Sequence, residues 1–420
     1  MNCVVCESPL NLDVAKIGDQ FPSAIYLENV TELQFGLSKS SLNLSQCINQ
    51  NCQLVQLTQP IDLDTVYKHY PYQSGTTATM RAILSSIVNE ALSIQDLGPG
   101  DVILDIGGND GTLLSLINHP ECILVNIDAA SNIPQEYEIS NYMYVNEKFS
   151  KDTYTSINIA APKIIFSVAV FYQLSTPLIF LRDAFSIMDD DSIFVLQMTY
   201  LDSMYEHNIF DNVVHEHVTF FSLNSLMYIA ELADLKVIGA KIVDSYGGSL
   251  RVYLVKTSST RHIPILENEM NEILLNEQTN KTNQVETLAS FGSSFEAWQS
   301  QARKLIDLQF KEFGPIIGMG ASTKGNMILQ ALKINEEIMP YIMDNNPKKI
   351  GTRTTGSFIK IVNEDEVFEL GVNILSLPYY YDEFFKQILT PRIKSGAFIE
   401  FISPLPVPKV VRLFGETSAN

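Results

Sequence analysis

The segment VILDIGGNDGTLLSLI, residues 102–117, limits the fold of this chain more than any other part of its sequence. An apolar run leads into a glycine-rich turn and then into a helix-like stretch, which indicates a strand–turn–helix unit. Strand-like and helix-like stretches alternate down to about residue 255, with further strand runs at CILVNI (122–127), KIIFSVAV (163–170) and IFVLQM (193–198). This alternation predicts βαβ units and a mostly parallel sheet. Residues 235–256 predict an antiparallel hairpin at its edge, because two strand runs flank a turn with Gly247 and Gly248.

A second, smaller α/β unit is predicted in the carboxyl-terminal part of the chain. Residues 266–290 are polar and poor in aromatic side chains, which is typical of a solvated helix or linker. Strand-like runs then return at PIIGMG (315–320), MPYIMD (339–344), VNILSLP (372–378) and AFIEFIS (397–403). A chain of 420 residues is long enough for two or three domains. We therefore expect three parts, residues 1–70, 71–258 and 259–420, the first of which has short elements and four cysteines.

Composition excludes some classes of function. The formal charge is −20, from 48 acidic and 28 basic side chains, and such a balance repels a nucleic-acid backbone. No apolar stretch approaches the roughly 20 residues of a membrane span. The amino terminus, MNCVVCESPL, lacks the basic and apolar regions of a signal peptide. We therefore expect a cytoplasmic protein with neither a nucleic-acid nor a membrane partner, and no sequence feature sets its oligomeric state.

Four of the five cysteines form two short-range pairs near the amino terminus. Cys3 and Cys6 are followed about 40 residues later by Cys47 and Cys52. Four thiolates on two tight turns supply the tetrahedral ligands of a structural zinc, and a cytosolic chain favours metal over disulfides. The alternative is that the four cysteines are incidental. A closed four-thiolate site leaves no position for substrate, so we expect this zinc to stabilise the fold only.

The glycine-rich turn is the predicted cofactor site. Gly107, Gly108 and Gly111 permit a tight turn and close ligand approach at a helix amino terminus. The loop reads D-I-G-G-N-D-G, so Asp105, Asn109 and Asp110 occupy a region where a pyrophosphate requires bare backbone. S-adenosylmethionine carries a sulfonium and an amine and no phosphate, so it suits this loop better than NAD does. Asp128 ends the next strand, where a carboxylate can bind ribose hydroxyls.

Four motifs together carry a resemblance over essentially the whole chain. DIGGNDG (105–111), NVVHEH (212–217), YGGSLRVYL (246–254) and GMGASTKGN (318–326) stand in the order found in sugar C-methyltransferases. Those enzymes act on nucleotide-linked 4-keto-deoxysugars. The resemblance implies a small zinc-binding region, a class I (Rossmann-like) methyltransferase domain that binds S-adenosylmethionine, and a carboxyl-terminal Rossmann-like domain that helps to hold the nucleotide-sugar. The chain departs from the family pattern at Val214, where a tyrosine is usual.

The resemblance also implies roles for individual residues. His217 matches the family's catalytic base, Glu216 its neighbouring carboxylate, and Tyr72 an active-site tyrosine of the YPYQSG stretch (70–75). Tyr70 and Ser74 of that stretch, and His215, are expected substrate contacts. The residues agree with this interpretation, because carbon methylation beside a ketone needs a base, and a histidine is largely neutral at pH 7.

Two other interpretations of the histidine pair remain. In an extended segment His215 and His217 share a face and could reach one metal ion, although no third ligand follows at a typical spacing. The two histidines could also be structural only.

The remaining expected substrate contacts lie nearer the carboxyl terminus. The GMGASTKGN loop opens a helix, so its amides, Ser322 and Lys324 are expected to cradle a diphosphate; the alternative is a Rossmann turn without a ligand. Asp344 ends the next strand and is an expected ribose contact. Arg251 either pairs with sugar or phosphate or lies along the sheet.

We therefore predict an S-adenosylmethionine-dependent C-methyltransferase with a nucleotide-linked keto-deoxysugar substrate. An NAD-dependent nucleotide-sugar oxidoreductase and a non-catalytic zinc-bearing interaction protein are the alternatives.

Overall fold

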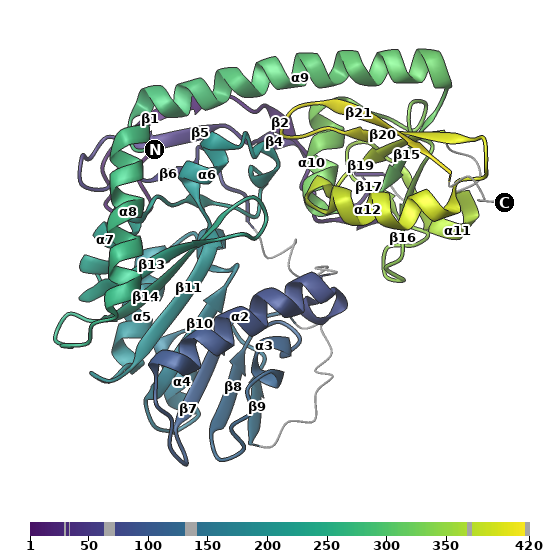
Figure 1. The fold of residues 1–420 in the computed structure, drawn as a ribbon. Helices are drawn as coiled ribbons and strands as arrows, with labels where there is room; N and C mark the ends of the chain where they lie inside the picture. The colour runs from purple at the N-terminus through teal and green to yellow at the C-terminus, as the bar shows by residue number, and fades with distance from the viewer. Residues whose placement is uncertain (29–30, 33, 63–71, 131–140, 368–371, 416–420) are drawn as a thin grey trace.

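The computed structural model describes residues 1–28, 31–32, 34–62, 72–130, 141–367 and 372–415. Two α/β bodies are joined by an amino-terminal region and by one long helix, α9 (Val285–Phe313), which runs along the top of the molecule in Figure 1. Within the described residues, no helix is both long and apolar enough to cross a membrane.

The middle domain is built on a seven-stranded sheet in the order β13-β14-β11-β10-β7-β8-β9. These strands are β7 (Val102–Ile106), β8 (Ile123–Ile127), β9 (Tyr142–Val145), β10 (Pro162–Val168), β11 (Ile193–Thr199), β13 (Leu235–Val243) and β14 (Ser249–Lys256). Among the described strands of this sheet, β14 alone runs opposite to the other six, which confirms the mostly parallel sheet and its closing hairpin. Alternate residues of β10 enter separate cores: Ile164 and Phe166 pack on one face of the sheet and Ile165 packs on the other.

Helices cover both faces of this sheet, as the alternating pattern predicted. They are α2 (Ala78–Ile94), α3 (Thr112–Ser115), α4 (Lys151–Ser156), α5 (Pro177–Ile187), α7 (Leu223–Glu231) and α8 (Pro264–Asn280). Helix α6 (Leu201–Glu206) instead packs toward α9. The core on one face holds α2 and α3 residues such as Leu84 and Leu113. The other core holds α5 and α7 residues such as Leu181 and Leu226. The sheet is therefore buried on both sides, which explains its continuous apolar runs.

The amino-terminal region contributes strands to three sheets. Its strands are β1 (Leu10–Ala15), β2 (Asp19–Gln20), β3 (Tyr26–Leu27), β4 (Ser40–Ser41), β5 (Leu44–Cys47) and β6 (Val55–Leu57). One sheet has the order β1-β5-β6-β12, in which β12 (Thr219–Phe220) comes from the middle domain. The strands β2 and β4 pair with each other, and β3 joins the carboxyl-terminal sheet. Residues 1–62 thus bridge the two α/β bodies.

The carboxyl-terminal domain has an eight-stranded sheet in the order β21-β20-β19-β15-β16-β18-β17-β3. Its own strands are β15 (Ile316–Met319), β16 (Tyr341–Asp344), β17 (Arg353–Thr354), β18 (Lys360–Asn363), β19 (Asn373–Ser376), β20 (Phe398–Ser403) and β21 (Lys409–Phe414). The five central strands are parallel, and the helices are α10 (Thr323–Ala331), α11 (Glu364–Val367) and α12 (Asp382–Leu389). The predicted second α/β unit is thus present.

Helix α9 is packed more closely than its polar sequence suggested. Its buried residues recur every three or four positions and form one stripe: Leu288, Phe291, Phe295, Trp298, Ala302 and Ile306. At Gly292 an added Cβ would lie 2.9 Å from the Cα of Ala15, so glycine allows α9 to lie directly on β1. Residues 266–290, the expected solvated helix or linker, hold nearly all of α8, a turn and the start of α9, and most side chains of α8 are exposed as expected.

Candidate active site

A cavity of about 1980 Å³ is lined by residues of both α/β domains. It opens where the parallel strands end, because Gly107 and Asp128 follow β7 and β8, and Gly320 and Asp344 lie at the ends of β15 and β16. Ligands of open α/β sheets bind at these strand ends. Single-ligand pockets occupy about 300–1,000 Å³, so this cavity has room for two molecules of moderate size.

The glycine loop forms one end of the cavity. A Cβ on Gly108 would lie 2.6 Å from Asp105 Oδ2 and 2.5 Å from Asn126 Oδ1, so only glycine fits there. The amide of Asn109 donates to Asp128 Oδ2 over 2.8 Å. The expected cofactor residues Asp105, Gly107, Asn109 and Asp128 all line the cavity.

Two expected cofactor residues have a different place. Asp110 does not line the cavity, because its carboxylate accepts hydrogen bonds from the amides of Gly75 (2.9 Å) and Thr112 (3.2 Å) and thereby fixes the loop. Gly111 is the N-cap residue of α3, with a φ of 81°, and it does not line the cavity either.

Acidic side chains gather at this end of the cavity, and their ionised forms repel one another. Burial, with the nearby charges of Asp128 and Asp110, raises the pKa of Asp105 to about 8. Burial also raises the pKa of Asp128. A phosphate placed here would meet carboxylates, whereas a cationic ligand would relieve their repulsion. The residues present therefore fit S-adenosylmethionine, whose sulfonium and amine are positive, and do not fit a pyrophosphate.

His217 lies in the wall between the two domains. Its Nδ1 is 2.7 Å from the carbonyl oxygen of Asn212, in the short helix η3 (Phe210–Asn212). Because a carbonyl only accepts, Nδ1 carries the proton and Nε2 keeps its lone pair. The Tyr172 ring packs edge-on against the imidazole at 4.2 Å between centroids. Burial, assisted by the charge of Lys324, lowers the pKa of His217 to about 3, so the ring is neutral at pH 7.

Glu216 lines the cavity beside His217. Its side chain is buried, and among the described residues its carboxylate oxygens meet only the backbone amides of Glu216 and Ala24, without a hydrogen bond of good geometry. Burial raises the pKa of Glu216 to about 7, against the smaller lowering effect of the Glu216 and Ala24 backbone amides. Buried polar atoms in folded proteins are nearly always hydrogen-bonded. An unpaired carboxylate on a cavity wall is therefore suited to bind a ligand donor.

His215 points away from the cavity, toward the amino-terminal region. Its Nε2 lies 3.3 Å from the carbonyl oxygen of Ser40, and burial lowers its pKa to about 4. His215 does not line the cavity, so it does not make the substrate contact that the sequence led us to expect. Within the described residues, the cysteines are the single group of metal-ligating side chains close enough to share an ion, and the structure offers no support for a metal at His215 and His217.

Tyrosines from distant segments surround the space in front of His217. The hydroxyl of Tyr246 hydrogen-bonds with those of Tyr72 and Tyr381. Together with Tyr172 and Tyr380, these residues line the cavity. The expected residue Ser74 also lines it, and its amide donates to Asn109 Oδ1 at 3.0 Å. Tyr70 lies outside the described residues.

The carboxyl-terminal loop forms the opposite wall. Ser322 caps α10 by accepting the Gly325 amide at 2.9 Å, and the Ala321 amide donates to Asp344 Oδ2 at 2.8 Å. This last bond repeats the bond between Asn109 and Asp128 in the middle domain. The expected residues Ser322, Lys324 and Asp344 all line the cavity, as do Lys348 and Lys349, which follow β16.

Arg251 is not a substrate contact. It is 1% exposed on β14, its Nε donates to Gln197 Oε1 at 2.8 Å, and its guanidinium forms an ion pair with Glu90 of α2. It is thus held within the middle domain by partners that satisfy its charge, and it does not line the cavity.

Sequence reasoning missed Tyr172, Tyr246 and Tyr380. Each follows a strand, and the rule that ligands bind at strand ends could have singled out FYQ (171–173) and YYY (379–381).

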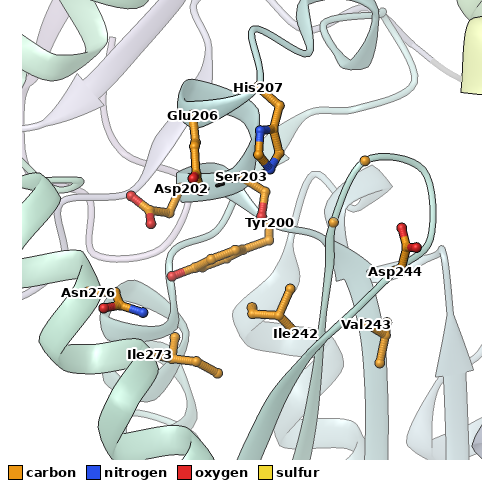
Figure 2. A pocket seen from close by; sticks show the side chains of 12 residues that line it. Tyr200, Asp202, Ser203, Glu206, His207, Ile242, Val243, Asp244, Ile273 and Asn276 are labelled. Atoms are coloured by element: carbon orange, nitrogen blue, oxygen red, sulfur yellow. Dashed lines mark ion pairs between the residues drawn. The ribbon is translucent and has the colours of Figure 1, made fainter.

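A second hollow of about 540 Å³ lies between α6, α8 and the end of β13 (Figure 2). Its wall is acidic, with Asp202, Glu206 and Asp244. The Asp202 carboxylate already accepts from Thr282 Oγ1 and Asn280 Nδ2, so it braces the turn after α8.

The four amino-terminal cysteines come together as predicted. All four Sγ atoms lie within 4.8 Å of one another, with Cys3 and Cys52 at 3.7 Å and Cys6 and Cys47 at 3.4 Å. Zinc bound tetrahedrally at about 2.3 Å from each sulfur separates its sulfurs by about 3.8 Å, so this cluster fits a four-thiolate zinc site.

Comparison with known proteins agrees with this architecture. A methyltransferase-domain model matches residues 77–240, and a C-methyltransferase C-terminal-domain model matches residues 244–406. The chain is 24% identical over 417 residues to the C-methyltransferase NovU of Streptomyces niveus, an alignment that covers 97% of this chain and 96% of that protein.

Two solved methyltransferases are more distant. CalO1, a methyltransferase in calicheamicin biosynthesis, is 12% identical with a TM-score of 0.33, over 42% of this chain and 55% of that chain. The magnesium protoporphyrin IX methyltransferase of Synechocystis PCC 6803 is 10% identical with a TM-score of 0.32, over 42% and 79%.

The two matched models cover both α/β domains in sequence order, and the sheet order of the middle domain is that of a class I methyltransferase. The chain therefore combines a methyltransferase domain with the carboxyl-terminal domain typical of C-methyltransferases.

Proposed function

We propose that this protein methylates the carbon beside the ketone of a nucleotide-linked 4-keto-deoxysugar, with His217 as the base. The observation that carries the proposal is the fixed tautomer of His217: Nδ1 is held by the Asn212 carbonyl oxygen, which leaves Nε2 unprotonated in the wall of the shared cavity. Removal of a proton beside a carbonyl requires such a base within hydrogen-bonding reach.

The two ends of the cavity support the two ligands. The acidic end, with Asp105 and Asp128, would hold S-adenosylmethionine, which supplies an electrophilic methyl group when bound. The end formed by Ser322, Asp344 and Lys349 combines a helix amino terminus, a carboxylate and a cation, which together suit a nucleoside diphosphate. Between the two ends, the tyrosine hydroxyls suit a hydroxylated sugar.

Each side chain near His217 has a proposed task. Glu216 accepts a hydrogen bond from a substrate hydroxyl. Its negative charge also stabilises the positive imidazole that forms when His217 takes the proton. Tyr72, tied to Tyr246, orients the sugar ring. The cysteine cluster does not line the cavity; it holds zinc and stabilises the amino-terminal region.

The test is incubation with isotopically labelled S-adenosylmethionine and a panel of nucleotide-linked 4-ketosugars, with mass spectrometry of the products. We expect the label on a ring carbon of one ketosugar. His217→Asn retains a donor toward the Asn212 carbonyl but removes the base, so we expect turnover to fall at least about 100-fold.

His215→Gln is the matched control, because it preserves a donor toward Ser40 at a buried histidine off the cavity wall. We expect its turnover to stay within about threefold of wild type. A folded His217→Asn protein with near-normal turnover would contradict the assignment.

A further inference from the structure

Lys324 reaches from the carboxyl-terminal domain into the middle domain. It lies in the first turn of α10, and its ammonium contacts Oδ1 of Asn212 in η3. The ammonium also lies over two aromatic faces, 5.2 Å from the Tyr246 ring centroid and 5.1 Å from that of Tyr380. These contacts place the cation beside the domain junction.

Lys324 and His217 are held by the same residue. Asn212 binds the lysine through its side-chain oxygen and the imidazole through its main-chain oxygen. Both side chains line the cavity, and the lysine charge is close enough to lower the pKa of His217. The structure therefore brings the cation next to the base, and not only to the carboxyl-terminal loop where the sequence placed it.

A buried carboxylate near the ammonium favours its charged form. Asp211, fully buried, accepts hydrogen bonds from the hydroxyls of Tyr379 (2.9 Å) and Tyr380 (3.0 Å), both of the carboxyl-terminal domain. Burial lowers the pKa of Lys324, and the charge of Asp211 opposes this effect. Asp211 thus favours the charged lysine and holds Tyr380, one of its aromatic neighbours, in place.

We propose that Lys324 is a catalytic residue whose ammonium donates a hydrogen bond to the ketone oxygen of the substrate and stabilises the enolate. This inference rests on the proposed function. In the step, the α C–H bond breaks and its proton goes to Nε2 of His217. The C–H electron pair forms a carbon–carbon double bond, and the carbonyl π pair moves onto the oxygen, which then faces the lysine.

Geometry favours the ketone over the diphosphate as the partner of Lys324. The ketone oxygen sits on the carbon next to the one that loses its proton, so a donor to this oxygen must lie beside the base. The diphosphate is attached at the anomeric carbon, elsewhere on the sugar ring. Lys349 is better placed for it, because its ammonium donates to the carbonyl oxygen of Ala321 at 2.7 Å, in the loop before α10.

The experiment compares Lys324→Met with Lys349→Met in the full chain. Turnover is measured with the accepted nucleotide-ketosugar, and α-proton exchange is measured in deuterium oxide without methyl donor. For Lys324→Met we expect kcat and the exchange rate to fall about 10²–10³-fold, the usual effect of losing one oxyanion donor, while KM changes less than about threefold. For Lys349→Met we expect KM to rise while kcat is largely kept.

A readout that needs no substrate accompanies the kinetics. The pKa of His217, followed by NMR, should rise in Lys324→Met because a nearby cation is lost. If Lys324→Met is unfolded, Lys324→Gln retains a donor toward Asn212 without the charge, and the same losses are expected.

The outcomes separate the inference from the proposed function. A Lys324 variant that keeps kcat and exchange but has a raised KM would make Lys324 a phosphate contact and overturn the inference alone. A wild-type protein that neither methylates nor exchanges any ketosugar would overturn the proposed function, and the inference with it.

Discussion

Neighbouring residues Glu216 and His217 have pKa values shifted in opposite directions by the same cause. Burial disfavours the charged form of each group, so it raises the pKa of Glu216 to about 7 and lowers that of His217 to about 3. The histidine is then neutral throughout the range in which the protein is handled. The glutamate is the group of this pair that titrates near neutrality.

This contrast predicts the pH dependence of the reaction. We expect kcat/KM to rise with pH through about 7, because only ionised Glu216 accepts a substrate hydroxyl and balances the protonated imidazole. Glu216→Gln should abolish this rise of kcat/KM with pH and lower the highest kcat/KM that is reached. If kcat/KM of Glu216→Gln still rose through pH 7, another group would be responsible for the pH dependence.

The same shift predicts the opposite trend for stability. A carboxyl pKa raised from 4.5 to about 7 means that the folded state binds a proton that the unfolded state has lost, so stability falls as pH rises through this window. At about 1.4 kcal/mol per pKa unit, the loss is about 3 kcal/mol. Urea unfolding should therefore show Glu216→Gln more stable than wild type at pH 8, and little different at pH 4.

At this scale the sequence predicted residues within motifs better than contacts across the molecule. The cavity residues of the glycine loop and the position of His217 follow from local chemistry and strand order. The partners of Asn212 and Lys324 come from different domains, so no local pattern reveals them. Two interpretations of Arg251 stayed open because a basic residue on a strand gives no sign of which face it occupies or that Glu90 lies opposite.

At the scale of elements, η3 is positioned by α9. Phe210 is fully buried and packs against Phe291, Phe295 and Trp298, with ring centroids 4.9, 5.4 and 5.5 Å away. Trp298 in turn donates to the carbonyl oxygen of Pro404 at 2.7 Å. The helix turn that holds His217 through Asn212 therefore depends on this aromatic cluster.

Phe210→Ala should thus affect both stability and activity. We expect a loss of about 3–5 kcal/mol in the free energy of unfolding, typical of a buried phenylalanine, measured by denaturant titration. We also expect a lower kcat, because η3 carries the carbonyl that fixes His217. Phe384→Ala, at a side chain 56% exposed, is the control and should change stability by less than about 1 kcal/mol. A stable Phe210→Ala protein would show that η3 is held by other contacts.

Strands of the middle domain were predicted well because they are buried on both faces and read as continuous apolar runs. The depth at which α9 packs was not predicted, since its buried stripe lies within a polar sequence and only the partner surface, including the close approach at Gly292, shows it.

At the scale of the whole molecule, the amino-terminal region connects the two α/β domains. Strand β6 pairs with β12 of the middle domain, and β3 pairs with β17 of the carboxyl-terminal domain. Strand β12 begins two residues after His217, so the sheet that contains Cys47 also holds the chain next to this histidine. A structural site in this region therefore affects how the cavity is assembled.

Loss of the cysteine cluster should destabilise more than its own segment. We expect one zinc per chain by elemental analysis, and a lower zinc content in Cys3→Ser/Cys52→Ser. A structural metal contributes several kcal/mol to folding, so the melting temperature should fall by about 10 °C or more, with loss of methyl transfer.

Cys122→Ser is the control, because it changes a buried thiol outside the cluster, and this variant should still bind zinc. The amino-terminal region pairs with strands of both α/β domains. Removal of zinc by a chelator should therefore lower the melting temperature of both domains together. Metal-free wild-type protein with an unchanged melting temperature would instead show that hydrogen bonding and packing alone hold the four thiols together.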